Sequence, residues 1–143
     1  MTTFIIEKII VKIGNLKQYL NYLSQLSKEI ESEEKYENDF RLIGNTERYL
    51  QLSAQCVIDI CQLIAVEESI KMVGENREIV SALKGKRIIT EKTASNLTKM
   101  VGMRNVLVHE YGEIDNKMVY ETLKNNMNDF EDFIEEIKKY FNK

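Results

Sequence analysis

The stretch RNVLVHEYGEID, from Arg104 to Asp115, contains the side chains of this sequence that are best suited to chemistry on phosphate groups. It holds the chain's one histidine, His109, with Arg104 five residues before it and Tyr111 two residues after it. An imidazole can give or take a proton near neutral pH, and a guanidinium is a permanent cation that binds phosphate oxygens. The sequence has no nucleophilic serine or cysteine beside His109 and no carboxylate cluster with metal-ligand spacing. This set therefore suits a reaction in which the substrate supplies the nucleophile, as RNA does with its 2′-hydroxyl group.

A helix would bring these side chains together. The apolar residues before and between them recur at helical spacing, and Gly112 supplies a C-terminal stop. With about 100° per residue, Asn105 and His109 fall on one face of such a helix, and Arg104 lines up with Tyr111 beside them. We therefore predict a strip on the last turns of this helix that carries a cation, an amide, an imidazole and a phenol.

The pattern of apolar residues predicts helices along the whole chain. These residues recur at spacings of three and four, and no segment shows convincing strand alternation. Thr90 and Asp115 have side chains that cap helix N-termini, and Gly74 and Gly85 punctuate the middle of the chain. We predict an all-α fold, an up-and-down bundle of four long helices and one short helix. The expected helices cover residues 1–30, 39–70, 77–83, 90–111 and 115–141. The second is apolar nearly all round, so it belongs in the middle of the bundle.

Length and composition fit a single domain over residues 1–143. The chain is 43% hydrophobic and 30% charged and has no proline, which is typical of a helical protein in water. A net charge of -3 argues against a protein that coats nucleic acid by bulk electrostatics. Charged residues interrupt the apolar N-terminal segment, and no uninterrupted apolar run is long enough to span a bilayer. Cys56 and Cys61 are interpreted as buried thiols in a reducing cytoplasm, so we expect a cytoplasmic protein without a membrane partner.

Three parts of the sequence resemble one known family. Arg104, His109 and Tyr111 stand in the order R-x4-H-x-Y, with Asn105 in the polar position after the arginine. This order resembles the motif of the HepT-like toxins in the HEPN superfamily. ERYLQLSAQCVIDI, residues 47–60, resembles the second-helix signature of that family, and EYGEID resembles its sequence after the histidine. The expected bundle length also matches, so the resemblance covers nearly the whole chain.

The resemblance implies a HEPN-like homodimer whose two motifs meet at a cleft along the dimer interface. It implies a metal-independent endoribonuclease without a cofactor, the toxin of a toxin–antitoxin pair. His109 would be the acid–base group, Arg104 would bind phosphate and stabilise the transition state, and Asn105 would help to position them. The implied partner is an MNT-type nucleotidyltransferase antitoxin, which can silence the toxin by transferring AMP to Tyr111. AMP would place bulk and negative charge where an RNA phosphate must lie.

A basic segment leads into the motif. Between residues 84 and 104 the chain has six basic residues and a single acid, Glu91. Such a run is often only a solvated face of a helix, and the sequence does not separate RNA from the antitoxin as a partner for it. Five of its residues are candidates for RNA binding: Lys84, Lys86, Arg87, Lys92 and Lys99.

Simpler interpretations stay open. The chain could be a non-catalytic HEPN binding or regulatory subunit of a nucleotidyltransferase, or a helical dimerisation domain with an accidental motif. His109 could be only a helix-end imidazole stabilised by the helix dipole, and Tyr111 only a packed aromatic residue. Arg104 could be only an ion-pair partner of Glu110 or Glu113.

Two residues near the expected site need their own explanation. Asp59 lies in the most apolar helix, so it needs a partner if it is buried. It could orient a basic group near the site or pair at an interface. Gly102, beside the motif, is expected to permit the close approach of another helix.

Overall fold

The fold is all-helical over the residues that the structure describes, which confirms the predicted class. The computed structural model describes residues 3–71, 76–109 and 114–142, and of His109 it describes the backbone. These ranges hold seven helices and no strand. The helices are α1 (Thr3–Glu29), α2 (Glu33–Glu37), α3 (Phe40–Glu67), α4 (Asn76–Gly85), α5 (Glu91–His109), α6 (Asn116–Asn125) and α7 (Asn128–Phe141).

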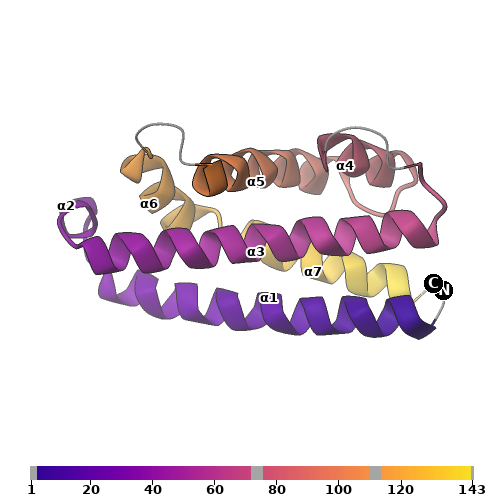
Figure 1. Ribbon diagram of the computed structural model, residues 1–143, viewed down its shortest axis with the longest axis horizontal. Coiled ribbons are helices and arrows are strands. Elements are labelled where there is room, and N and C mark those ends of the chain that lie inside the picture. The colour runs from indigo at the N-terminus through magenta and orange to yellow at the C-terminus, as the bar shows by residue number, and fades with distance from the viewer. Residues whose placement is uncertain (1–2, 72–75, 110–113, 143) are drawn as a thin grey trace.

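The helix α3 occupies the middle of the bundle (Figure 1). α1 lies antiparallel beside it over most of its length, α5 packs along its other side, and α7 runs behind it in this view. Leu50, Ile60 and Ile64 of α3 are each 0% exposed, as expected for a helix that is apolar nearly all round. The beginning of α1 and the end of α7 lie at the same end of the bundle, and α6 lies at the other end (Figure 1).

The last predicted helix is in fact two helices, α6 and α7. α6 ends before Asn126, whose backbone N–H donates to the Thr122 carbonyl at 3.0 Å, and α7 begins at Asn128. Asparagine side chains compete for backbone hydrogen bonds and therefore favour helix ends. The periodicity missed this break because the buried residues Leu123 and Phe130 are seven positions apart, so the apolar stripe keeps its phase across it.

The short helix α2, which was not predicted, separates α1 from α3. The side-chain oxygen of Ser32 accepts a hydrogen bond from the Lys35 backbone N–H at 3.1 Å and caps α2. A carboxylate oxygen of Asp39 caps α3 by accepting from the backbone N–H groups of Arg41 and Leu42. These two caps satisfy helix-end donors where the chain reverses direction between its two longest helices.

The start of α5 is held by α7. The Thr90 hydroxyl accepts from the Thr93 backbone N–H at 3.2 Å, which confirms the predicted cap. Glu136 of α7 accepts from the Thr90 backbone N–H at 2.6 Å, and the hydroxyl groups of Thr90 and Thr93 also donate to its carboxylate. A carboxylate at a helix N-terminus is also favoured by the helix dipole. Glu136 therefore fixes the first turn of the helix that carries the motif.

One helix in the described part of the chain, α3, is long and apolar enough to cross a membrane. More than half of its most apolar window is buried by the other helices of the bundle. Its composition is therefore accounted for by its place in the core.

Candidate active site

Arg104 and Asn105 lie on the last two turns of α5, the helix expected to carry the motif. Both residues are half-buried. The described part of α5 reaches His109, whose backbone is one helical turn beyond Asn105, within the helix that was predicted. The expected modification site, Tyr111, lies outside the described residues. The structure thus places three of the four motif residues on one helix end.

The guanidinium of Arg104 is held by two side-chain amides. Its Nε donates to Gln55 Oε1 of α3 at 3.0 Å, and its Nη1 donates to Asn105 Oδ1 at 2.9 Å. The second bond supports the expectation that Asn105 helps to position the site. Glu110 and Glu113, the acids considered as ion-pair partners of Arg104, lie outside the described residues.

The contact with Gln55 continues across α3 to α1. Gln55 Nε2 donates to Asp59 Oδ1 at 2.8 Å, and Lys12 Nζ of α1 donates to Asp59 Oδ2 at 3.0 Å. The hydrogen bond to Asp59 raises the pKa of Lys12, against the opposing effect of burial. Asp59 therefore has a partner for its charge in Lys12 of the same chain, and it also contacts Gln55, the residue that accepts from Arg104.

These contacts orient Arg104 without neutralising it. Both of its described partners are amide oxygens, which carry no net charge. A guanidinium has more N–H donors than these two bonds use, so it can still bind the oxygens of a phosphate in the bidentate manner typical of arginine. A guanidinium that the described residues orient through neutral groups, next to the position of a histidine, suits the stabilisation of charge on a phosphorus centre.

Gln55 was missed by the sequence analysis. Its partner Arg104 is 49 positions away along the chain, so no local pattern connects them. The available signal was its position four residues before Asp59, which places the two on one face of a helix. Two polar residues on one face of a mostly apolar helix segment need hydrogen-bond partners if they are buried, so they indicate that another polar side chain lies against that face.

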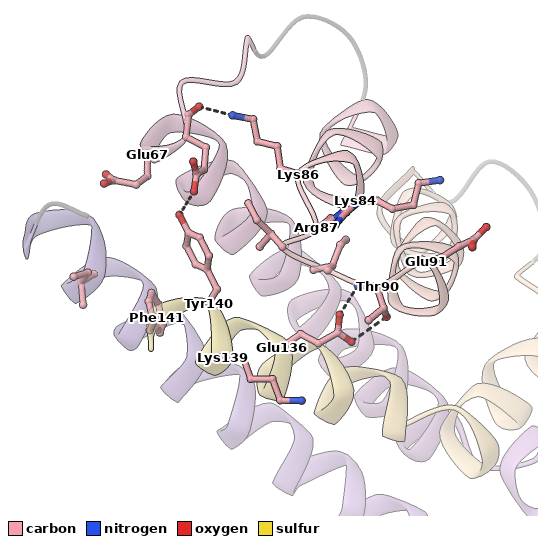
Figure 2. Close-up of a pocket in the computed structure, with 14 residues that line it drawn as sticks. Glu67, Lys84, Lys86, Arg87, Thr90, Glu91, Glu136, Lys139, Tyr140 and Phe141 are labelled. Carbon is pink, nitrogen blue, oxygen red and sulfur yellow. Dashed lines mark hydrogen bonds between the residues drawn. The ribbon is translucent and has the colours of Figure 1, made fainter. Parts of the chain in front are cut away.

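The basic segment does not gather around Arg104. Lys84, Lys86 and Arg87 line a cleft of about 1240 Å³ at the opposite end of α5 (Figure 2). α5 has 19 residues and a rise of about 1.5 Å per residue, so its ends are about 27 Å apart. Lys92 and Lys99 are exposed along α5. The segment that is continuous in sequence is therefore spread along the length of α5.

Acidic side chains share this cleft with the basic ones. Glu67, Glu68, Glu91 and Glu136 all line it. Lys86 Nζ donates to the Glu68 backbone carbonyl at 3.2 Å, and Tyr140 Oη donates to Glu68 Oε1 at 2.5 Å (Figure 2). Burial, with a further contribution from Glu68, raises the pKa of Tyr140. The cleft is therefore mixed in charge.

The two cysteines agree with their expected structural role, whereas Gly102 has different surroundings from those expected. Cys56 and Cys61 are free, buried thiols, as predicted, and burial raises the pKa of Cys61 to about 12. A Cβ atom at Gly102 would lie 3.4 Å from Arg77 Nη2 of α4 and would meet no backbone atom of another described helix within 4 Å, so the predicted close approach of a helix is not observed there.

The fold and the motif define a helical-bundle protein of the HEPN ribonuclease type. The family model described as "Ribonuclease HepT-like" matches residues 16–137, and the chain belongs to this family. It is 30% identical over 130 residues to the mRNA nuclease HepT of Shewanella oneidensis, with 91% of this chain and 96% of that one covered. It is 31% identical over 137 residues to the tRNA nuclease HepT of Aphanizomenon flos-aquae, with 94% and 92% covered.

Solved structures show the same fold. A tri-AMPylated HEPN toxin from Shewanella oneidensis, in complex with an MNT antitoxin, superposes with a TM-score of 0.85 at 29% identity. That match covers 97% of this chain and 99% of the toxin. A cytosolic protein of unknown function from Bacillus subtilis, YutE, is 20% identical with a TM-score of 0.69 over 89% of this chain and 88% of its own, which shows the fold alone.

Proposed function

We propose that this protein is a metal-independent endoribonuclease, the toxin of a HEPN/MNT toxin–antitoxin pair. Membership of the HepT-like family supports this function, and two relatives are nucleases named for mRNA and tRNA. The observation that carries the proposal is the arrangement on the last turns of α5, where Arg104 is held by neutral amides five residues before His109. These groups meet the needs of phosphodiester cleavage without a protein nucleophile.

In the proposed reaction the 2′-oxygen of a ribose attacks the adjacent phosphorus. The bond from phosphorus to the 5′-oxygen of the next nucleotide breaks, which leaves a 2′,3′-cyclic phosphate and a 5′-hydroxyl end. His109 transfers the protons, since the 2′-hydroxyl must lose one and the leaving 5′-oxygen must gain one. Arg104 stabilises the negative charge that builds on the non-bridging phosphate oxygens, and Asn105 helps to hold Arg104.

The active form is proposed to be a homodimer. One imidazole per chain serves poorly as base and acid in the same step, whereas a cleft shared by two chains has two histidines. An apolar groove of about 640 Å³ between α1 and α3 supports this assembly, because Phe4, Val11 and Val66 are exposed along it. Lys12 and Asp59 line the same groove, so it continues into the contacts of Arg104. Sedimentation of the purified protein as a monomer at micromolar concentration would contradict the dimer.

The proposed partner is an MNT-type nucleotidyltransferase antitoxin, because the similar Shewanella toxin is AMPylated and bound to an MNT antitoxin. The hydroxyl oxygen of Tyr111 would attack the α-phosphorus of ATP, lose its proton and release pyrophosphate. The added phosphate is negative and would repel RNA from the site. Tyr111→Phe should remain an active nuclease that the antitoxin no longer silences by AMP transfer, as mass spectrometry and an RNA cleavage assay can establish together.

The five basic residues of the segment before the motif are proposed to attract RNA over a wider surface. Lys92 and Lys99 are exposed on the same helix as Arg104, whereas the other three lie at the far end of α5. Charges at this distance act on the encounter with RNA rather than on the cleaved bond. The proposed location of the protein is the cytoplasm, where RNA and ATP are present.

The test is cleavage of end-labelled RNA by the unmodified protein in the presence of a chelator. Cleavage that leaves 2′,3′-cyclic phosphate ends, and that His109→Ala lacks, supports the proposed reaction. Absence of cleavage by a protein whose mass shows no adduct would contradict it. The second candidate, a non-catalytic HEPN binding or regulatory subunit of the nucleotidyltransferase, would then be favoured, because it requires Tyr111 and the basic surface but not His109.

A further inference from the structure

Gln55 and Asp59 lie one helical turn apart on α3, between Arg104 of α5 and Lys12 of α1. Gln55 uses both ends of its amide, since Oε1 accepts from Arg104 Nε at 3.0 Å and Nε2 donates to Asp59 Oδ1 at 2.8 Å. A reversed amide would put its NH2 group against the Nε–H of Arg104 and its oxygen against the carboxylate. One orientation of Gln55 therefore satisfies both neighbours.

We propose that Gln55 and Asp59 are positioning residues for Arg104 in RNA cleavage, a role that rests on the proposed ribonuclease function. Asp59 fixes the amide of Gln55, and Gln55 fixes the guanidinium of Arg104 before RNA binds. A free arginine side chain samples many rotamers, so ordering it in advance removes an entropic cost from the reaction. Neither Gln55 nor Asp59 needs to touch the substrate for this effect.

Gln55 lies between Arg104 and Asp59 in this series of hydrogen bonds, and this order explains how the guanidinium is held by the described residues without loss of its charge. A carboxylate in direct contact with Arg104 would compensate the positive charge that a phosphate needs. Here a neutral amide stands between them, and the second oxygen of Asp59 binds Lys12 at 3.0 Å. The side chain of Asp59 is 25% exposed and that of Lys12 is 38% exposed, so the pair lies at the edge of the groove.

The chain offers a matched control in Gln62. It lies seven positions after Gln55 on the same face of α3, and it is also half-buried. Its Nε2 donates to Asn76 Oδ1 of α4 at 3.2 Å, away from Arg104. Gln62→Leu therefore removes an amide hydrogen bond from the same helix and leaves the described contacts of Arg104 in place. Gln62 also lines the groove proposed for the dimer, so the two variants are compared only after sedimentation shows that both assemble as the wild type does.

The experiment compares the kcat and KM of RNA cleavage in Gln55→Leu and Gln62→Leu. Gln55→Leu should lower kcat about tenfold with little change in KM, because the misplaced group acts on the reacting phosphate. Gln62→Leu should keep the kcat of the wild type. Both variants should unfold at similar denaturant concentrations. Equal kcat values for the two variants would overturn the positioning role.

A second pair of variants tests Asp59. Asp59→Asn keeps an oxygen that can accept from Gln55 Nε2, whereas Asp59→Leu has none. The asparagine variant should therefore retain most of the wild-type kcat, and the leucine variant should fall to the level of Gln55→Leu. Equal activity of the two Asp59 variants would contradict the contact through Gln55.

A readout independent of nuclease activity is the NMR signal of the Arg104 Nε–H group. In the wild type and in Gln62→Leu this hydrogen should exchange slowly with water, and in Gln55→Leu the protection should be lost. Unchanged protection in Gln55→Leu would overturn the contact itself. A wild-type protein that cleaves no RNA would overturn the proposed function, and the Nε–H signal would still decide whether Gln55 holds the guanidinium.

Discussion

Basic side chains occur at both ends of α5, but their surroundings differ. At the C-terminal end Arg104 contacts the neutral oxygens of Gln55 and Asn105. At the N-terminal end Lys84, Lys86 and Arg87 share a cleft with four glutamates (Figure 2). A cation held by neutral groups keeps its charge for a ligand, whereas one among carboxylates has its charge partly compensated. The comparison supports the proposal that the chemical step takes place at the C-terminal end of α5, and that the partly compensated cations at the N-terminal end act only on the encounter with RNA.

The largest effect is expected from a substitution at the C-terminal end of α5 alone. His109→Ala should lower the cleavage rate by about 100-fold or more, because the acid–base group is lost. The helical circular-dichroism signal should stay the same, since the variant keeps buried residues that pack α5 into the bundle, such as Leu97 and Leu107. Loss of helical signal in this variant would instead indicate a structural role for His109.

Removal of charge at the other end should change KM rather than kcat. Lys84→Ala combined with Lys86→Ala should raise KM severalfold at low salt and weaken the salt dependence of RNA binding, because fewer counterions are released. Lys17→Ala combined with Lys28→Ala makes the same change in net charge on exposed positions of α1 and serves as the control. Equal changes in KM for the two double variants would show that net charge, not this end of α5, attracts RNA.

The hydrogen bonds between Glu136 of α7 and the N-terminal end of α5 should contribute to the stability of the fold. Glu136→Ala removes the acceptor of the Thr90 and Thr93 donors, so the free energy of unfolding should fall by about 1–2 kcal/mol in urea titrations. The adjacent Glu135 contacts the exposed Lys138 at 3.4 Å, and Glu135→Ala should cost less than about 0.5 kcal/mol. Similar losses in the two variants would contradict the anchoring of α5 by α7.

The smallest expected effect is a pH dependence at the Lys12–Asp59 pair. The folded-state pKa of Lys12 is raised above its usual value of 10.5, so its contribution to stability is present below that pH and is lost as the pH rises through the folded-state pKa. The stability difference between the wild type and Lys12→Gln should stay below about 1 kcal/mol and shrink in alkaline solution. A difference that grows above pH 10.5 would contradict this pair.

The sequence was sufficient for most of the fold because the helices bury regular apolar stripes. Ile9, Leu16 and Leu23 of α1 are each 0% exposed, as their spacing predicted. The break between α6 and α7 was not predictable from this spacing, because Leu123 and Phe130 stay in phase across it. Periodicity therefore reports which face is buried better than it reports where a helix ends.

The site was predictable only where its residues are close in sequence. Arg104, Asn105 and His109 lie within two turns of one helix, so their spacing placed them together. Gln55 reaches Arg104 from another helix, and Asp59 was noticed only as a charge in an apolar segment. For the basic segment, closeness in sequence was misleading, since its residues lie up to the length of α5 apart in the structure.

The most direct test of the assignment of chemistry to the C-terminal end of α5 is the cleavage rate of Arg104→Lys at saturating RNA. Lysine keeps the positive charge but has neither the Nε donor for Gln55 nor the planar group that binds two phosphate oxygens. We predict a loss of about 100-fold in kcat, with kcat unchanged in the Lys84→Ala, Lys86→Ala double variant. Full activity of Arg104→Lys, together with a loss of kcat in the double variant, would contradict the account.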